Sequence, residues 1–189
     1  MKVFIENEAG SNQKNLYNEK TLEYRKTVEV SRKYPYPYGF ILETTSGDGD
    51  NLDCFILTDK ELKTGSIVEC EPIGLMEQFE DGKEDHNVLA ILRGESIKVD
   101  TDIKNKLTEF VSHVFDHRKE KIVKVGSFYG KEKAQEYIKK CRDEIFNKVP
   151  QAISVQKKIK IGNIEIVEPR QIVYDILKYK KLDISSCFW

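Results

Sequence analysis

The stretch "SGDGDNLDCF", residues 46–55, places Asp48, Asp50 and Asp53 within six positions, directly before an apolar run. In an extended "LDCFIL" segment Asp53 would project from a largely apolar face, and the two glycines of the stretch permit a turn that brings the carboxylates together. Two carboxylates about 4 Å apart repel each other by roughly 4 kcal/mol at an effective dielectric of about 20. A divalent cation removes that repulsion, and Mg²⁺ suits the site because it takes carboxylate oxygens and bridges to substrate phosphates.

An acidic, glycine-rich turn can also occur without a bound Mg²⁺ ion, and the sequence excludes some of these alternatives. A solvated connection between two strands is the alternative for an isolated "DGD". An EF-hand calcium loop is excluded, because Leu52 and Asp53 occupy the positions where that pattern requires an oxygen ligand and a glycine. An aspartyl-phosphate enzyme would end its apolar strand at the first aspartate, whereas here the long strand follows the turn.

Two neighbouring segments favour a phosphate and metal site over a solvated turn. Upstream, "YPYPYGF" at residues 34–40 has two prolines that stiffen an extended segment and three tyrosines that offer hydroxyls. Aromatic packing at a sheet rim is the alternative for this segment. Downstream, "EQFEDGKEDHN" at residues 77–87 supplies a second acidic turn, for which solvation is again the alternative.

Short strands are expected to position these residues. Apolar runs predict strands at "VFIE", "TVEV", "GFILE", "LDCFIL", "SIVECEPIGLM" and "NVLAIL", a pattern typical of a barrel or sandwich. From Asp102 to Phe115 the apolar spacing becomes helical, and a second helix is predicted over about residues 131–148. Near the C-terminus, Gly162-Asn163 predicts a two-residue hairpin, followed by a short amphipathic helix in "RQIVYDILKY".

Composition limits the class of protein. The chain has 189 residues, and 31 Lys plus Arg against 32 Asp plus Glu leave a formal net charge of −1. This balance argues against nucleic acid or a membrane as partner, and no segment has the apolar length of a signal peptide or a membrane span, so a cytoplasmic protein is expected. The scattered cysteines are expected to be free thiols. His113 and His117 lack an HExxH motif and are expected to be helix-end or surface residues rather than zinc ligands.

The combination of "YPYPYGF", the ten positions from Tyr38 to Asp48, "DGDNLD" and the later acidic turn resembles the soluble family I inorganic pyrophosphatases. The resemblance covers about residues 3–148. It implies an α+β fold: a closed or nearly closed five-stranded OB-like β-barrel flanked by two α-helices. The barrel domain would span residues 1–149, and residues 150–189 would form an extension, a hairpin and short helix, packed on the barrel or on a partner subunit. A homo-oligomer is expected from the resemblance alone.

The resemblance also implies Mg²⁺-dependent hydrolysis of inorganic pyrophosphate to two phosphates, with Mn²⁺ as a substitute. Five acidic residues would hold metal ions: Asp48, Asp53, Asp85, Glu80 and Glu6. Asp50 would orient the attacking water and accept its proton, assisted by Tyr38 and Lys119. Basic and hydroxyl groups would bind the substrate: Lys14, Lys26, Tyr34, Arg118 and Lys119.

Several positions depart from the family pattern. Asn51 follows the second aspartate, where proline or glutamate is usual. Leu16 stands where a carboxylate is expected, Asn87 where a lysine is expected, and Arg118 where a tyrosine usually precedes the lysine. Two registers stay open: Glu80 or Asp81 as the first acid of the later turn, and Lys26 or Arg25 as the basic residue of the hairpin.

Three functions are compatible with this pattern. The first is a Mg²⁺-dependent inorganic pyrophosphatase. The second is a hydrolase of another phosphoanhydride, because positions 16, 87 and 118 alter the phosphate-binding set. The third is a non-catalytic binding protein that retains the fold and binds a partner through the hairpin and the terminal "CFW". Phosphate release with and without Mg²⁺ and a panel of phosphoanhydrides would separate them.

Overall fold

The computed structural model describes residues 1–118, 120–142, 158–161 and 164–167. The chain divides into two compact units, Met1–Phe146 and Asn147–Trp189. In the second unit β10 (Lys158–Ile161) pairs antiparallel with β11 (Ile164–Val167), so the predicted hairpin is confirmed. The helix predicted in residues 170–179 lies outside the described residues.

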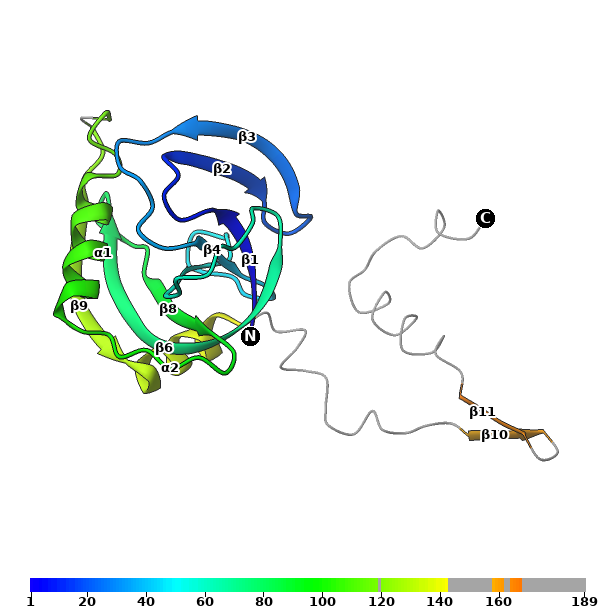
Figure 1. Ribbon diagram of the computed structural model, residues 1–189. Coiled ribbons are helices and arrows are strands. Elements are labelled where there is room, and N and C mark those ends of the chain that lie inside the picture. Colours follow the sequence, from blue (N-terminus) through cyan, green and yellow to red (C-terminus); the bar gives the residue numbers. More distant parts are fainter. Residues whose placement is uncertain (119, 143–157, 162–163, 168–189) are drawn as a thin grey trace. The chain divides into compact units, whose positions relative to one another are not determined.

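Five strands of the first unit close into a ring, in which all neighbours except β5 and β8 run antiparallel. In order around the ring they are β1 (Lys2–Asn7), β4 (Tyr38–Ile41), β5 (Leu52–Ile56), β8 (Asn87–Leu92) and β6 (Ile67–Glu80), which pairs back to β1 (Figure 1). The sheet continues from β6 into β7 (Lys83–Glu84) and β9 (Val123–Gly130), while β2 (Gln13–Asn18) and β3 (Glu23–Glu29) form a separate hairpin. The predicted α+β class and the five closing strands are confirmed.

Ring closure depends on one long strand and one close approach. β6 has 14 residues and a register shift between Pro72 and Gly74, so it can pair with β1 near one end and with β7 and β9 near the other. At Gly39 in β4, a Cβ atom would lie 1.8 Å from the carbonyl oxygen of Phe4 in β1. The two backbones therefore approach more closely than any side chain at Gly39 would permit.

Both faces of β5 are buried, which is why its apolar residues form a continuous run. Leu52, Cys54 and Ile56 belong to one buried cluster, together with Ala134 and Ile138. Phe55 and Leu57 belong to a second cluster, together with Leu107, Phe110 and Val111. Because side chains alternate along a strand, Asp53 shares the Phe55 side, as predicted.

Two helices supply the apolar side chains that cover these faces. α1 (Thr101–His113) begins after Asp100, whose side chain accepts a 2.9 Å hydrogen bond from the backbone N–H of Ile103. α2 (Lys131–Cys141) ends earlier than predicted, because Arg142 adopts extended geometry and pairs with Thr44. Residues 143–148 of the predicted helix lie outside the described residues. Across the described ranges, no helix combines the length and apolar character needed to cross a membrane.

Candidate active site

One pocket collects six of the candidate site residues predicted from the sequence. Each comes from a different strand or loop: Lys14 from β2, Tyr34 from the segment after β3, Tyr38 from β4, Asp53 from β5, Glu80 from β6 and Asp85 from the turn before β8. The rest of the lining is mainly apolar, and much of it comes from α1 and the residues just after it. Charged groups facing an apolar wall are poorly hydrated, so their mutual repulsion is only weakly screened.

Burial and neighbouring carboxylates destabilise the ionised forms of the two aspartates in the pocket. Burial, and then the charge of Asp85, raise the pKa of the Asp53 carboxyl, while Lys14 acts in the opposite direction. Burial, and then the charge of Glu80, raise the pKa of Asp85. Burial and the neighbouring carboxylates together therefore outweigh the attraction of Lys14 for these two ionised carboxylates.

Tyr38 contacts this acidic group directly. Its hydroxyl donates a hydrogen bond to the Asp53 carboxylate. Burial and the charge of Asp53 hold the pKa of Tyr38 well above its usual value, so the phenol remains a donor. Burial and then Asp53 also raise the pKa of the nearby Glu6 to about 8.

An amide network lies behind Asp85, and its central residue, Gln78, was not predicted from the sequence. The Nε2 atom of Gln78 donates to Asp85 Oδ2 at 2.5 Å, and its Oε1 atom accepts from Asn87 Nδ2 at 2.9 Å. Gln78 precedes Glu80 by two positions in β6 and so shares its side of the strand, which was the available signal. The Oδ1 atom of Asn87 is buried and has no hydrogen-bond partner among the described residues.

Lys121 is a second residue that the sequence analysis did not identify. Its Nζ atom lies 2.5 Å from Glu80 Oε1, and its ammonium lies 3.9 Å from the centre of the Phe115 ring. Lys14 lies over the same ring at 5.5 Å. The signal in the sequence was the alternation of "RKEK", which puts Lys121 two positions after Lys119.

Asp48 and Asp50 lie on an exposed turn and are not among the residues that line the pocket. The Oδ1 atom of Asp48 accepts hydrogen bonds from the Ser46 hydroxyl and, at 3.1 Å, from the backbone N–H of Asp50. Asp50 still acts on the buried acids of the site, because its charge contributes to the raised pKa of Glu6.

Among the described basic residues, Lys26, Arg25 and Arg118 are not part of the pocket lining. Lys26 in β3 pairs with Leu16, next to a register shift, and is exposed, as is Arg25. Arg118 is exposed and lies 3.5 Å from Glu120 through its Nε atom. Lys119 lies outside the described residues.

The donor atoms of the pocket suit a hard divalent cation. Asp53 and Asp85 supply carboxylate oxygens, and the unpartnered Oδ1 of Asn87 is a neutral oxygen donor in the same lining. In the conformation of the described residues, no three acidic, histidine or cysteine side chains gather closely enough to hold a metal ion. Glu80 of the same lining and Asp48, whose charge acts on Asp85, are further sources of carboxylate oxygens.

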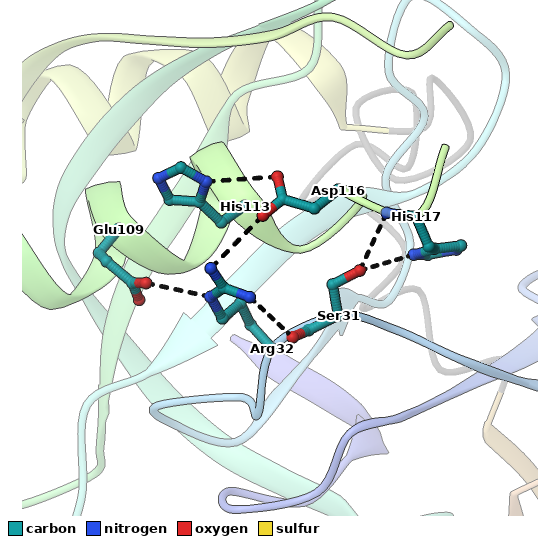
Figure 2. Close-up of polar contacts among 6 residues, drawn as sticks. All are labelled: Ser31, Arg32, Glu109, His113, Asp116 and His117. Carbon is teal, nitrogen blue, oxygen red and sulfur yellow. Dashed lines mark hydrogen bonds and ion pairs between the residues drawn. The ribbon is translucent and has the colours of Figure 1, made fainter. Parts of the chain in front are cut away.

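His113 and His117 belong to a separate surface network (Figure 2). His113 Nδ1 lies 3.3 Å from Asp116 Oδ1, and His117 Nδ1 lies 2.8 Å from the Ser31 hydroxyl. Arg32 belongs to the same network, because its Nη2 atom lies 3.4 Å from Asp116 Oδ2. Both histidines are exposed and have different partners, and His113 is the last residue of α1, which confirms the prediction of helix-end or surface residues.

Carboxylates, a lysine and tyrosine hydroxyls in one pocket, beside a ring of five strands, are the groups that a protein uses to bind a divalent cation and a phosphate. The chain belongs to the inorganic pyrophosphatase family, whose model matches residues 3–145. It is 34% identical over 152 residues to an inorganic pyrophosphatase of Nanoarchaeum equitans, covering 75% of this chain and 94% of the relative. It is also 34% identical over 151 residues to one of Saccharolobus solfataricus, covering 74% and 88%. The solved inorganic pyrophosphatase of Neisseria gonorrhoeae has a TM-score of 0.70 at 30% identity, covering 78% of this chain and 91% of that one.

Proposed function

We propose that the chain hydrolyses inorganic pyrophosphate to two phosphates and requires Mg²⁺, or Mn²⁺ in its place. One observation carries the proposal: Lys14, Asp53 and Asp85, from three distant segments, line one pocket and act electrostatically on one another. The family match and relatives at 34% identity support the same reaction.

The acidic residues of the site would hold the metal ions: Asp48, Asp53, Asp85, Glu80 and Glu6. Glu6 is buried, and it is close enough to Asp53 for the charge of Asp53 to raise its pKa further. When bound, divalent cations lower the pKa of water and offset the charge of the phosphates. Tyr38 donates to Asp53 and thereby fixes the orientation of that carboxylate. Asp50, on the exposed turn, would accept the proton of the attacking water.

Basic and hydroxyl side chains would bind the two phosphates: Lys14, Lys26, Tyr34, Arg118 and Lys119. Lys14 and Tyr34 line the pocket, so they are the residues of this set whose positions best support the role. The positive charge of lysine offsets negative charge that moves onto the leaving phosphate. For Lys26 and Arg118, which are exposed, contact with the substrate stays a prediction.

The test is phosphate release from pyrophosphate by the purified full-length chain, with Mg²⁺, with Mn²⁺ and with a chelator. Asp53→Asn preserves shape and removes a charge, and we expect it to lower kcat by about 10²- to 10³-fold. Asp50→Asn, which removes the group that would accept the proton of the attacking water, is expected to abolish release. Asp59→Asn, at an exposed aspartate after β5, is the matched control and should keep wild-type activity. Absence of release with either metal would contradict the proposal, and release in chelator would contradict its metal requirement.

A second candidate, hydrolysis of another phosphoanhydride, is favoured by the pocket at Asn87. Where the family pattern has lysine, this chain places a neutral amide that is bonded to Gln78 at 2.9 Å. A neutral amide in place of an ammonium favours a substrate with less negative charge next to position 87, such as the ester-linked phosphate of a nucleoside triphosphate. Comparison of kcat/KM for pyrophosphate, tripolyphosphate and nucleoside triphosphates decides between the two candidates, since a preference for pyrophosphate eliminates the second.

A further inference from the structure

Asn51 lies between Asp50 and Asp53, at a position where proline or glutamate is usual in the family. Proline has no backbone N–H and no side-chain amide, and in Asn51 each of these groups is hydrogen-bonded. Its backbone N–H donates to Glu19 Oε2 at 2.6 Å, and its Nδ2 donates to the carbonyl oxygen of Glu19 at 3.1 Å. Its Oδ1 accepts from Lys20 Nζ at 2.7 Å. Asn51 is 5% exposed, so these hydrogen bonds are largely shielded from water.

Lys20 also reaches the other end of the acidic turn. Its Nζ atom donates to the carbonyl oxygen of Thr44 at 2.7 Å and to the Thr45 hydroxyl at 2.8 Å. The Thr44 hydroxyl in turn accepts a hydrogen bond from the backbone N–H of Leu52 at 3.0 Å, so the residues before and after the acidic turn are also bonded to each other. One ammonium thus joins residues on both sides of the segment that carries Asp48 and Asp50.

Glu19 and Lys20 belong to the connection between β2 and β3, so the contacts join the tip of that hairpin to the acidic turn. Glu19 follows Leu16, where a carboxylate is missing from the family pattern, by three positions on the same hairpin. Burial, and then the charges of Asp50 and Asp48, raise the pKa of the Glu19 carboxylate, so the hairpin tip and the aspartates are neighbours.

We propose that Glu19, Lys20 and Asn51 form a positioning device, here called the hairpin clamp, which holds Asp48 and Asp50 in place for divalent cation binding. The inference rests on the proposed function, because it assumes that the turn supplies cation ligands. Residues that fix the orientation of ligands typically change metal affinity by about 10- to 100-fold when they are removed. The hairpin clamp is therefore expected to act on metal affinity and to leave the folded ring intact.

The direction in which replacement of Lys20 changes the cation affinity distinguishes a positioning role from a purely electrostatic one. Removal of the positive charge of Lys20 from beside an acidic site should strengthen cation binding if Coulomb attraction alone matters. Loss of the hairpin clamp should weaken binding instead. Asn51→Ala removes the amide contacts without a change of charge, so it should weaken binding in the same direction as Lys20→Met.

The experiment measures Mn²⁺ binding to the full-length chain by electron paramagnetic resonance without substrate, with folding followed by circular dichroism. We expect Lys20→Met and Asn51→Ala each to raise the Kd for Mn²⁺ about tenfold or more, and the double variant to add little further. Lys60→Met, at an exposed lysine paired with Glu95 at 3.0 Å, is the control and should bind as wild type.

Wild-type or tighter Mn²⁺ binding by Lys20→Met would overturn the hairpin clamp. If Lys20→Met does not fold, Asn51→Ala decides, and unchanged binding by that variant would overturn the inference equally. Failure of the proposed function is distinguishable, because the wild-type chain itself would then bind no Mn²⁺ and release no phosphate. A positioning role is further supported if saturating Mg²⁺ restores kcat in the variants to within about threefold of wild type, since the lost affinity is then the main defect.

Discussion

The ammonium of Lys121 lies 2.5 Å from the Glu80 carboxylate, beside the pocket that Glu80 lines. The Lys121 side chain is only 15% exposed, and the Phe115 ring lies beneath its charge. A cation that binds Glu80 must therefore compete with Lys121, and a displaced Lys121 ammonium is available to a phosphate. We therefore expect this pair to couple metal binding to substrate binding.

Lys121→Met should separate the two effects of that coupling. We expect KM for pyrophosphate to rise about 10- to 100-fold, because a hydrogen bond to a charged group contributes about 1.5–3 kcal/mol. Mn²⁺ should bind more tightly without substrate, because Glu80 loses its competitor. Steady-state kinetics and a metal titration measure both quantities. Lys124→Met, at an exposed lysine of β9, is the control, and a fall in both affinities would contradict the coupling.

Stability of the metal-free chain should decrease with rising pH because of Glu6. Burial, and then the charge of Asp53, raise the pKa of Glu6 from 4.5 to about 8. The folded state favours the neutral carboxyl, so its contribution is complete below about pH 4.5 and is lost as the pH rises to about 8. The free energy of unfolding should then fall by up to about 1.4 kcal/mol per pH unit across that window.

Urea unfolding in chelator at several pH values measures this slope. Glu6→Gln should reduce it, since the amide does not titrate. Glu61→Gln, at a side chain that is 89% exposed, should leave the slope unchanged. A free energy of unfolding that increases between about pH 5 and pH 8 would show that ionised carboxylates are stabilised in this fold, contrary to expectation.

The sequence predicted the parts of this site that depend on local alternation. Asp53 shares the buried Phe55 side of β5 because side chains alternate, and α1 follows from its helical apolar spacing. β2 was not predicted, since "QKNLYN" mixes polar residues on both faces. Residues that depend on long-range register were missed as well. Lys121 meets Glu80 through the pairing of Glu80 with Val123 in β9, which no local pattern reveals.

The register of the β2–β3 hairpin shows the same limit. Spacing left Lys26 and Arg25 open as the basic residue near the substrate. In the structure Lys26 pairs with Leu16, and a register shift follows between Leu16 and Tyr17. An irregularity of one residue reverses the face to which each side chain points, so spacing alone could not settle the assignment.

Removal of the C-terminal extension should leave catalysis intact. Every described residue that lines the pocket precedes α2, so a chain truncated after Val149 is expected to keep kcat/KM within about twofold, as for a change remote from a site. Phosphate release and light scattering should be measured together. A change of oligomeric state on truncation would assign the extension to assembly. A large loss of activity with unchanged assembly would contradict the proposed domain boundary.

Asn87→Lys should shift the chain toward pyrophosphate. Asn87 is 1% exposed and its Nδ2 donates to Gln78 at 2.9 Å, so we expect the substitution to cost about 1–3 kcal/mol of stability through the broken amide contact. The new ammonium would face the pocket near Asp85 and add the cation that the family pattern has there. We expect kcat/KM for pyrophosphate to rise about tenfold relative to nucleoside triphosphates.

Asn87→Met is the matched comparison for this substitution, because it has a similar length and no charge. It should show the same loss of stability in thermal unfolding without the gain in selectivity. Equal selectivity in the lysine and methionine variants would mean that charge at position 87 does not determine the substrate. In that case Leu16 and Arg118 would remain as the altered positions, and Leu16→Glu, which returns an acidic side chain to β2, would be the next variant to assay.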